Sequence, residues 1–277
     1  MSKRPPLVTV LMSVYNAKNT LDNAIKSILN QTYEKFEFLI IDDGSDDDTW
    51  ERLVNYAAVD ERIKLVRNEE NKGLGYCLRQ GVAIAKGTFI ARMDADDIAR
   101  PARLERQVRV MTSDASVHIL GTWAEDIDDD GRVIGYRKVP VTHAAIRKTM
   151  PFANPMLHSS VMFRREAILS VGSYNPNCRW LQDYDLWFRC MAAGLGFQNI
   201  PEFLMQYRVG RSYHRRKSWQ YRKVDFQVRL QGYRTLGVRG LEWSGLAVPL
   251  ILGAVPSSLA PLVHRIGKKF DPRQKVT

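Results

Sequence analysis

Over the first hundred residues, short runs of consecutive apolar and β-branched residues alternate with segments whose apolar residues recur every three or four positions. The first pattern is typical of strands buried on both faces, and the second of helices that bury one face. Because the connections are short, this alternation predicts right-handed crossovers and a Rossmann-like, mainly parallel α/β sheet flanked by helices. Strands are predicted at residues 7–15, 36–42, 63–68 and 88–94, and helices at 19–30, 45–58 and 75–86.

After residue 100 the elements become longer and less regular. A helix is predicted over 101–111, because Pro101 suits the first turn of a helix. The stretch 124–140 predicts a β-hairpin that turns at Asp130 and Gly131. A strand leading into a helix is predicted over 158–172, and a further helix over 180–194.

The C-terminal part of the chain is first strongly basic and then uncharged. Between residues 207 and 234, nine arginines and lysines stand against the single acidic residue Asp225. Residues 243–263 carry no charge, but three prolines interrupt them and argue against a clean membrane-spanning helix. This partly apolar tail therefore predicts either amphipathic pieces at an anionic membrane surface or a helical pair packed on the main domain.

Composition and charge narrow the class of protein. Of 277 residues, 45% are hydrophobic and 26% are charged, which is ordinary for a folded soluble chain. The net charge of +11 favours an anionic partner, which could be nucleic acid, anionic lipid or a phosphorylated ligand. The three cysteines are widely separated and form no C-x-x-C pair, so reduced, mostly buried thiols in a cytosolic setting are predicted.

Polar side chains follow each of the four predicted strands. In open parallel sheets, ligands bind beyond the carboxyl ends of the strands, so these side chains are expected to meet at one edge of the sheet. They are Ser13, Tyr15 and Asn16 after the first strand, Asp42, Asp43, Gly44 and Ser45 after the second, Asn68 and Asn71 after the third, and Asp94, Asp96 and Asp97 after the fourth.

The stretch "IARMDADD" (90–97) ends a buried strand with three aspartates. Asp94 and Asp96 are one residue apart, so both side chains can face the same side of an extended chain. Mg²⁺ and Mn²⁺ prefer carboxylate and phosphate oxygens, and the pair therefore suits a metal-bound diphosphate. The alternative is that these aspartates only cap the helix that begins near Pro101.

Three other residues have both a functional and a structural interpretation. Asp43 can accept a hydrogen bond from the N–H of a nucleobase, or belong to an ordinary turn in "IIDDGSDDDT". Asp183 can act as a general base or merely as a favourable acidic residue at a helix start. His158 can be a metal ligand or a structural histidine ahead of an apolar strand.

Taken together, several stretches resemble glycosyltransferase family 2 in the order that the family has them. They are "VTVLMSVYNAKNTLDNAIKSILNQTYEKFEFLIIDDGSDDDT", "NKGLGYCLRQGVAIAKGTFIARMDADD" and "LQDYDLWFR", and the resemblance covers residues 7 to 210. It implies a GT-A fold, an inverting, metal-dependent reaction with Mn²⁺ or Mg²⁺, and a nucleotide-sugar donor, with a UDP-sugar favoured. The segment "NPMLHSSVMFRR" is similar to bacterial members that build surface polysaccharide.

The resemblance also implies roles for the nucleotide-binding residues. Ser13 and Asp43 match positions that contact the nucleoside, Asp43 on the base, and Tyr15 lies in the same loop as Ser13. Asp94 matches the aspartate near the ribose and the metal.

For the chemistry, Asp96 matches the direct metal ligand next to the diphosphate, and Asp183 matches the catalytic base. His158 is kept as a further candidate metal ligand.

These roles predict an enzyme that adds a sugar to a hydroxyl of a glycan acceptor, expected to be lipid-linked, at the inner face of the cell membrane. The chain is expected to divide into a nucleotide-sugar-binding half (1–114), an acceptor and catalytic-base half of the same domain (115–210) and the C-terminal extension (211–277). The processive "QxxRW" motif is not visible, which favours single additions over polymerisation.

Two alternatives stay open on sequence alone. A sugar nucleotidyltransferase also uses a parallel sheet and metal-binding carboxylates, but its first loop is normally rich in glycine, and "SVYNAKNT" has none. A non-enzymatic nucleic-acid binder would explain the positive charge and the aromatic residues among the arginines of the tail. It leaves the aspartates at the strand ends unexplained, so nucleic acid is not an expected partner.

Overall fold

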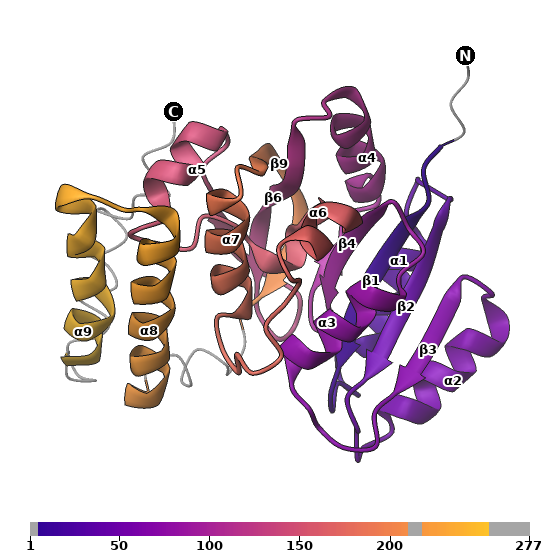
Figure 1. Ribbon diagram of the computed structural model, residues 1–277. Coiled ribbons are helices and arrows are strands. Elements are labelled where there is room, and N and C mark those ends of the chain that lie inside the picture. Colours follow the sequence, from indigo (N-terminus) through magenta and orange to yellow (C-terminus); the bar gives the residue numbers. More distant parts are fainter. Residues whose placement is uncertain (1–4, 210–217, 255–277) are drawn as a thin grey trace.

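The computed structural model describes residues 5–209 and 218–254, and at its centre is one nine-stranded mixed sheet (Figure 1). The strand order is β3-β2-β1-β4-β8-β6-β9-β5, and β7 pairs with β6 outside this path. The strands are β1 (Val8–Val14), β2 (Phe36–Asp42), β3 (Ile63–Arg67), β4 (Phe89–Asp94), β5 (Ile98–Ala99), β6 (Val117–Ile127), β7 (Val133–Arg137), β8 (Met162–Arg164) and β9 (Gly196–Arg208).

The strands β3, β2, β1 and β4 are parallel, as the alternating pattern predicted. In the register of this pairing, Ser13 of β1 lies opposite Ile41 of β2 and opposite Asp94 of β4. Val14 pairs with Asp42 in the same register. The carboxyl ends of these strands therefore lie together at one edge of the sheet.

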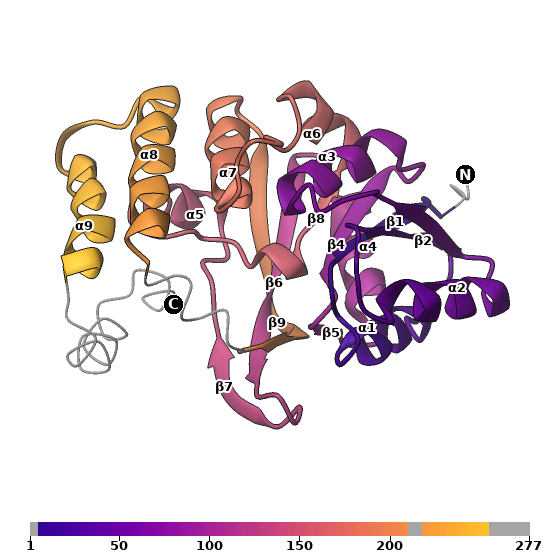
Figure 2. The same cartoon turned by 90° about the horizontal axis from the view of Figure 1, so that it is seen from below.

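Helices cover both faces of the sheet (Figures 1 and 2), and each face has its own apolar core. One core takes side chains from α1, α2 and α4, and the other from α3, α5, α6, α7 and α8. The helices are α1 (Leu21–Leu29), α2 (Thr49–Val59), α3 (Leu74–Ile84), α4 (Arg103–Ser113), α5 (His143–Thr149), α6 (Arg165–Ser170), α7 (Gln182–Ala192), α8 (Trp219–Leu236) and α9 (Ala247–Ala254). All the helices predicted between residues 19 and 194 are present, with ends shifted by a few residues.

The strand β9 was not predicted. It has 13 residues and runs parallel to β6 over most of its length, although Pro201 and Glu202 interrupt its apolar pattern. A proline cannot donate to the ladder and normally argues against an inner strand. Register shifts in the pairing around Thr122 and Trp123 of β6 coincide with this interruption.

The predicted hairpin is confirmed, and it projects from the sheet as β6 and β7 (Figure 2). Gly131 has φ +82°, a left-handed conformation that glycine adopts without strain. Asp128 closes the turn, because its Oδ1 accepts from the backbone N–H of Arg132 at 2.8 Å.

The described part of the tail is a helical pair at the end of the molecule farthest from α2 (Figure 1). The helix α8 packs on α7, and Gly232 lies so close to the Phe188 ring that a Cβ would not fit. The helix α9 packs in turn on α8. This is the packed alternative of the two predicted for the tail.

None of the described helices is long and apolar enough to cross a membrane. The uncharged stretch predicted over 243–263 extends beyond residue 254 and so lies partly outside the described residues.

The cysteines are all free thiols, as predicted. Cys77 and Cys190 are buried, and Cys178 is partly buried. Burial raises the pKa of each thiol, to about 11 for Cys178, so these groups are neutral and unreactive near pH 7.

Candidate functional site

Three aspartates gather at the carboxyl end of β4 and in the turn that follows it. One carboxylate oxygen from each of Asp94, Asp96 and Asp97 lies within 4.8 Å of the others. Asp94 is the last residue of β4, and the backbone N–H of Asp97 reaches back toward the Asp94 carbonyl at 3.4 Å. This tight turn points the side chains of the three residues to one place.

Two arginines hold this acidic cluster in place. Arg92 precedes Asp94 by two residues on the same face of β4, is almost fully buried, and forms an ion pair with the Asp94 carboxylate. Arg208, at the end of β9, donates from its backbone N–H to Asp97 Oδ1 at 2.9 Å and from Nε to the Asp96 carbonyl at 2.9 Å. Its Nη1 also donates to the carbonyls of Asp128 and Asp129 in the hairpin turn. The cluster is thus tied to two other parts of the chain.

Two of the three carboxyl groups in the cluster have raised pKa values. The Asp96 side chain is exposed at its surface, but desolvation by the protein atoms around it and the neighbouring Asp94 raise its pKa to about 6, against a partial opposing effect of Arg92. Burial raises the pKa of Asp97 well above its usual range, and the charges of Asp94 and Asp96 add to this. A cation in the cluster would favour the ionised carboxylates and relieve both effects.

The donor atoms fit a hard divalent cation. All three side chains offer carboxylate oxygens, which are the ligands that Mg²⁺ and Mn²⁺ prefer. Oδ2 of Asp97 is buried and has no hydrogen-bond partner within the described residues. A buried acceptor without a donor is costly, so this oxygen is better explained with a ligand beside it.

Asp43 lies at the end of β2, beside an open recess of about 410 Å³ lined by Gly44, Ser45, Arg67, Asn68 and Glu69. Its carboxylate is buried and accepts from Asn68 Nδ2 at 2.8 Å. It also accepts from the backbone N–H groups of Lys72 at 3.0 Å and Gly73 at 2.8 Å. Asp43 therefore holds the loop after β3 against the end of β2 and shapes the wall of the recess.

The loop after β1 closes against the loop after β2. Asn16 has φ +51°, an uncommon conformation for a residue other than glycine. Its backbone N–H donates to Ser45 Oγ at 3.0 Å, and its Oδ1 accepts from Asp46 N at 3.1 Å. Tyr15 is left half exposed in front of the sheet edge. Ser13, one residue inside the strand, is partly buried.

Asp183 lies in the first turn of α7, next to an unusual backbone conformation and within hydrogen-bond distance of Asn154. The preceding Leu181 is in the left-handed region at φ +60°. Asn154 Nδ2 donates to Asp183 Oδ2 at 2.6 Å. The first turn of α7 lies on the side of the sheet where β1, β2 and β4 end (Figure 1). Burial raises the pKa of Tyr174, and the charges of Asp183 and Asp94 both add to this, so both carboxylates act on the same buried hydroxyl.

Comparison with known proteins identifies the family. Residues 9–172 match the sequence profile described as "Glycosyl transferase family 2". The chain belongs to this family. Putative glycosyltransferase EpsE of Bacillus subtilis is 33% identical to it over 274 residues, which cover 98% of this chain and 96% of EpsE. O-antigen biosynthesis glycosyltransferase WbnJ of Escherichia coli is 34% identical over 73% of this chain and 80% of WbnJ.

A further relative and two solved structures complete the comparison. The UDP-Gal:alpha-D-GlcNAc-diphosphoundecaprenol beta-1,3-galactosyltransferase of Escherichia coli is 31% identical over 84% of this chain and 86% of its own length. S. aureus TarS 1-349 in complex with UDP-GlcNAc superposes with a TM-score of 0.66 at 14% identity, over 96% of this chain and 88% of that one. Mannosyltransferase PcManGT from Pyrobaculum calidifontis, in complex with GDP-Man and Mn²⁺, superposes with a TM-score of 0.62 at 17% identity, over 96% and 81%. These likenesses show that this family 2 glycosyltransferase has the predicted GT-A fold.

In this glycosyltransferase His158 lies in a structural setting. Its Nε2 is 2.9 Å from the Tyr174 hydroxyl, and its ring packs on those of Tyr174 and Trp187. Burial and the charge of Arg92 lower the pKa of His158 well below its usual range, so the imidazole is neutral. The group of potential metal ligands found among the described residues consists of the three aspartates and does not include His158. His158 is thus a buried, neutral histidine packed on two aromatic rings, and its role as a metal ligand stays a prediction that the metal site proposed below does not use.

Several functional candidates were not singled out by sequence reasoning. Asp97 was noted only as one polar residue among many, yet it completes the acidic cluster. Asn154 and Arg208 gave no local signal, because each acts on a partner that only folding brings near. For Arg92 a signal did exist, since an arginine inside a buried strand needs a buried partner.

Proposed function

We propose that this glycosyltransferase moves a sugar from a nucleotide-sugar donor to a hydroxyl of a glycan acceptor, with inversion at the anomeric carbon. One observation carries the proposal: three convergent carboxylates backed by a buried arginine lie at the edge of the sheet, on the side where the first turn of α7 carries Asp183 (Figure 1). A divalent cation would stabilise the departing nucleoside diphosphate, and a base would take the proton of the attacking hydroxyl.

The donor is expected to lie along the carboxyl ends of β1, β2 and β4. The recess beside Asp43 suits the base, and Ser13 and Tyr15 flank the nucleoside. Asp94 lies near the ribose, and Asp96 with Asp97 would hold Mn²⁺ or Mg²⁺. The cation would supply Lewis-acid stabilisation of the leaving diphosphate. A UDP-sugar is the favoured donor, in line with the UDP-Gal and UDP-GlcNAc named for two of the similar proteins.

Asp183 is proposed to take the proton from the acceptor hydroxyl as that oxygen attacks the anomeric carbon. Attack comes from the face opposite the diphosphate, so a single displacement inverts the configuration without a covalent intermediate. The hydrogen bond from Asn154 fixes the Asp183 carboxylate, and the rigid first turn of α7 limits its movement. The helix α7 therefore contributes to the rate enhancement by holding the base within reach of the attacking hydroxyl.

The acceptor is proposed to be a lipid-linked glycan in cell-surface polysaccharide synthesis. The support is the names of the relatives, which include an O-antigen enzyme and a transferase that acts on a diphosphoundecaprenol acceptor. Such an acceptor would place the enzyme at the inner face of the cell membrane.

The test is a panel of UDP- and GDP-sugars, each offered with Mn²⁺ or Mg²⁺. A true donor at a hundred times its Kd should add about 2.7 kcal/mol to the free energy of unfolding, and slow hydrolysis should release nucleoside diphosphate. Release of pyrophosphate from a nucleoside triphosphate and a sugar phosphate would instead identify a sugar nucleotidyltransferase. Full donor binding and hydrolysis by Asp96→Asn would overturn the metal site.

A further inference from the structure

The helical pair α8–α9 carries an unusual surface at one end. Apolar side chains are exposed there: Trp219 is 51% exposed, Leu250 44% and Ile251 61%. The sequence of α9 contains no charged residue. Large exposed apolar side chains that cluster in this way mark an interaction site more often than a free surface.

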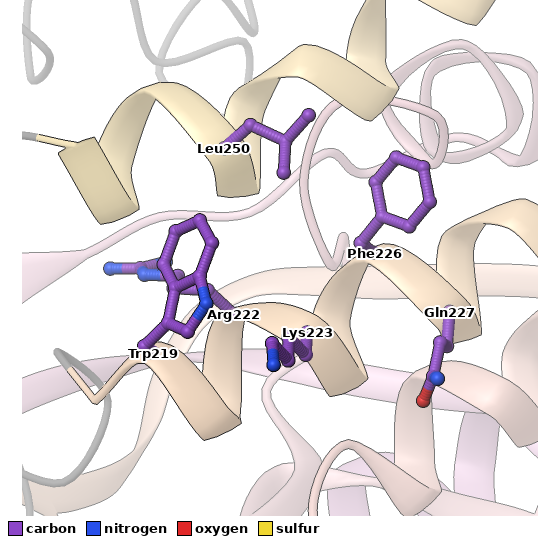
Figure 3. A pocket seen from close by; sticks show the side chains of 6 residues that line it. All are labelled: Trp219, Arg222, Lys223, Phe226, Gln227 and Leu250. Atoms are coloured by element: carbon purple, nitrogen blue, oxygen red, sulfur yellow. The ribbon is translucent and has the colours of Figure 1, made fainter.

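Cations lie directly beside these apolar groups. A pocket of about 140 Å³ between the two helices is lined by Trp219, Arg222, Lys223, Phe226, Gln227 and Leu250. In Figure 3, Trp219 and Phe226 rise from α8 toward α9, and Leu250 points back toward α8. We refer to Trp219, Arg222, Lys223, Phe226, Leu250 and Ile251 as the α8–α9 surface.

The positive charge of this surface is not neutralised within the described residues. Asp225 is the one acidic residue of α8, and it is taken up by a buried ion pair with Arg229 at 2.7 Å. The ion pairs found among the described residues include neither Arg222 nor Lys223. Nε of Arg222 is buried without a hydrogen-bond partner in the same part of the chain. An anionic partner would satisfy both cations.

The α8–α9 surface includes the first turn of α8, which lies at the same end of the helical layer as the first turn of α7 with Asp183 (Figure 1). Trp180, just before α7, packs on Tyr221 of α8 with ring centroids 6.1 Å apart. A partner bound at this surface would therefore lie at the same end of the helical layer as Asp183 (Figure 1).

We propose that the α8–α9 surface docks on an anionic lipid bilayer. Trp219, Leu250 and Ile251 would enter the boundary between headgroups and acyl chains, and Arg222 and Lys223 would contact lipid phosphates. This combination of aromatic, aliphatic and basic side chains is the one that interfacial helices use. Nucleic acid would form ion pairs with Arg222 and Lys223 and stack on Trp219, but it would leave Leu250 and Ile251 in water. An anionic bilayer therefore accounts for both the basic and the apolar side chains of the α8–α9 surface.

The test is flotation of the full-length protein with phosphatidylcholine vesicles, with and without phosphatidylglycerol. The key variant is Lys223→Glu with Ile251→Asp, at two exposed positions outside the catalytic site. Each cation contributes about fivefold to the affinity for an anionic membrane, and an inserted isoleucine adds to this. Reversing one charge and removing the isoleucine should weaken binding at least about tenfold.

A matched control has the same change in charge at the opposite end of the molecule. Val59→Asp with Lys64→Glu alters two exposed residues of α2 and β3 and should leave binding unchanged. A separate measurement follows tryptophan fluorescence with brominated lipids, where Trp219→Phe should remove most of the quenching.

Equal binding by the key variant and the control would overturn the proposal, as would equal binding to vesicles with and without phosphatidylglycerol. Displacement of the bound protein by RNA, without loss in the key variant, would point to a nucleic acid instead. The outcome is separate from that of the proposed function, because membrane binding is measured without donor and the donor assays need no membrane.

Discussion

Arg92 and Asp94 form an ion pair on one face of β4, with the arginine almost fully buried and the aspartate at the edge of the sheet. The arginine thus lies directly behind the acidic cluster as a fixed positive charge. It lowers the cost of keeping three carboxylates together, and it draws Asp94 into a defined position before any ligand arrives. The same charge also helps to keep the neighbouring His158 neutral.

Replacing Arg92 by methionine should destabilise the protein. Removing one partner of a buried pair leaves the other uncompensated, and a cost of about 3 kcal/mol in the free energy of unfolding is expected. Urea denaturation at pH 7.5 measures it. Arg52→Met is the control, because its ion pair with Asp22 is about 40% exposed on both sides and should contribute less than about 1 kcal/mol. Equal losses in the two variants would contradict the role given to Arg92.

Asp96→Asn should stabilise the metal-free protein while it removes activity. Because burial and Asp94 raise the pKa of Asp96 to about 6, folding favours its protonated form. The resulting stabilisation is full below the unfolded pKa near 4 and is lost as the pH rises through about 6. At pH 7.5 the neutral asparagine should therefore gain about 1 kcal/mol, a figure discounted because Asp96 is partly solvated.

The same substitution should lower sugar transfer about a hundredfold or more, since it weakens the hold on the cation. In the unaltered enzyme, donor affinity with Mn²⁺ should fall as the pH drops below about 6, where Asp96 takes up a proton. Thermal unfolding with and without donor, followed from pH 5 to pH 8, measures both effects. A donor affinity that stays constant over this range would rule out Asp96 as a ligand.

Asp183→Asn should lower the rate of sugar transfer without weakening nucleotide binding. Loss of a general base typically lowers kcat by about 10² to 10⁴, while protection by the nucleotide should persist because the role proposed for Asp183 is toward the acceptor hydroxyl. Asp185→Asn is the matched control in the same helical turn. Asp185 pairs with Arg189 at 2.7 Å, so its loss should affect stability but leave kcat within a few fold. Steady-state kinetics with the identified donor and acceptor distinguish the two, and similar kcat values would contradict the assignment.

Arg208→Met should disturb the acidic cluster from a distance. The side chain donates to the carbonyls of Asp96, Asp128 and Asp129, so its removal leaves several acceptors without a donor. A loss of about 2 to 3 kcal/mol in unfolding free energy is expected, together with a weaker metal-dependent donor affinity. Arg132→Met, whose side chain is largely exposed, should change neither. Unchanged donor affinity in Arg208→Met would show that the cluster does not depend on this contact.

The local pattern was sufficient for the parallel half of the sheet. Runs such as residues 36–42 are mostly apolar because their strands are buried on both faces, and such runs alternate with amphipathic helices in few other folds. The placement of Asp43, Asp94 and Asp96 at one edge followed from that topology, since parallel strands end on the same side. The strand β9 escaped prediction because Pro201 and Glu202 break its pattern, while its pairing with β6 tolerates them.

By itself, then, the sequence determined which strands form the parallel sheet and which carboxylates stand at its edge, because both depend on the spacing of neighbouring residues. Only the tertiary structure decided how these carboxylates are supported. Arg208 reaches Asp96 across 112 residues of chain, and Asn154 reaches Asp183 across 29. Contacts of this kind leave no periodic trace, because they depend on how separate elements pack and not on the spacing within one element.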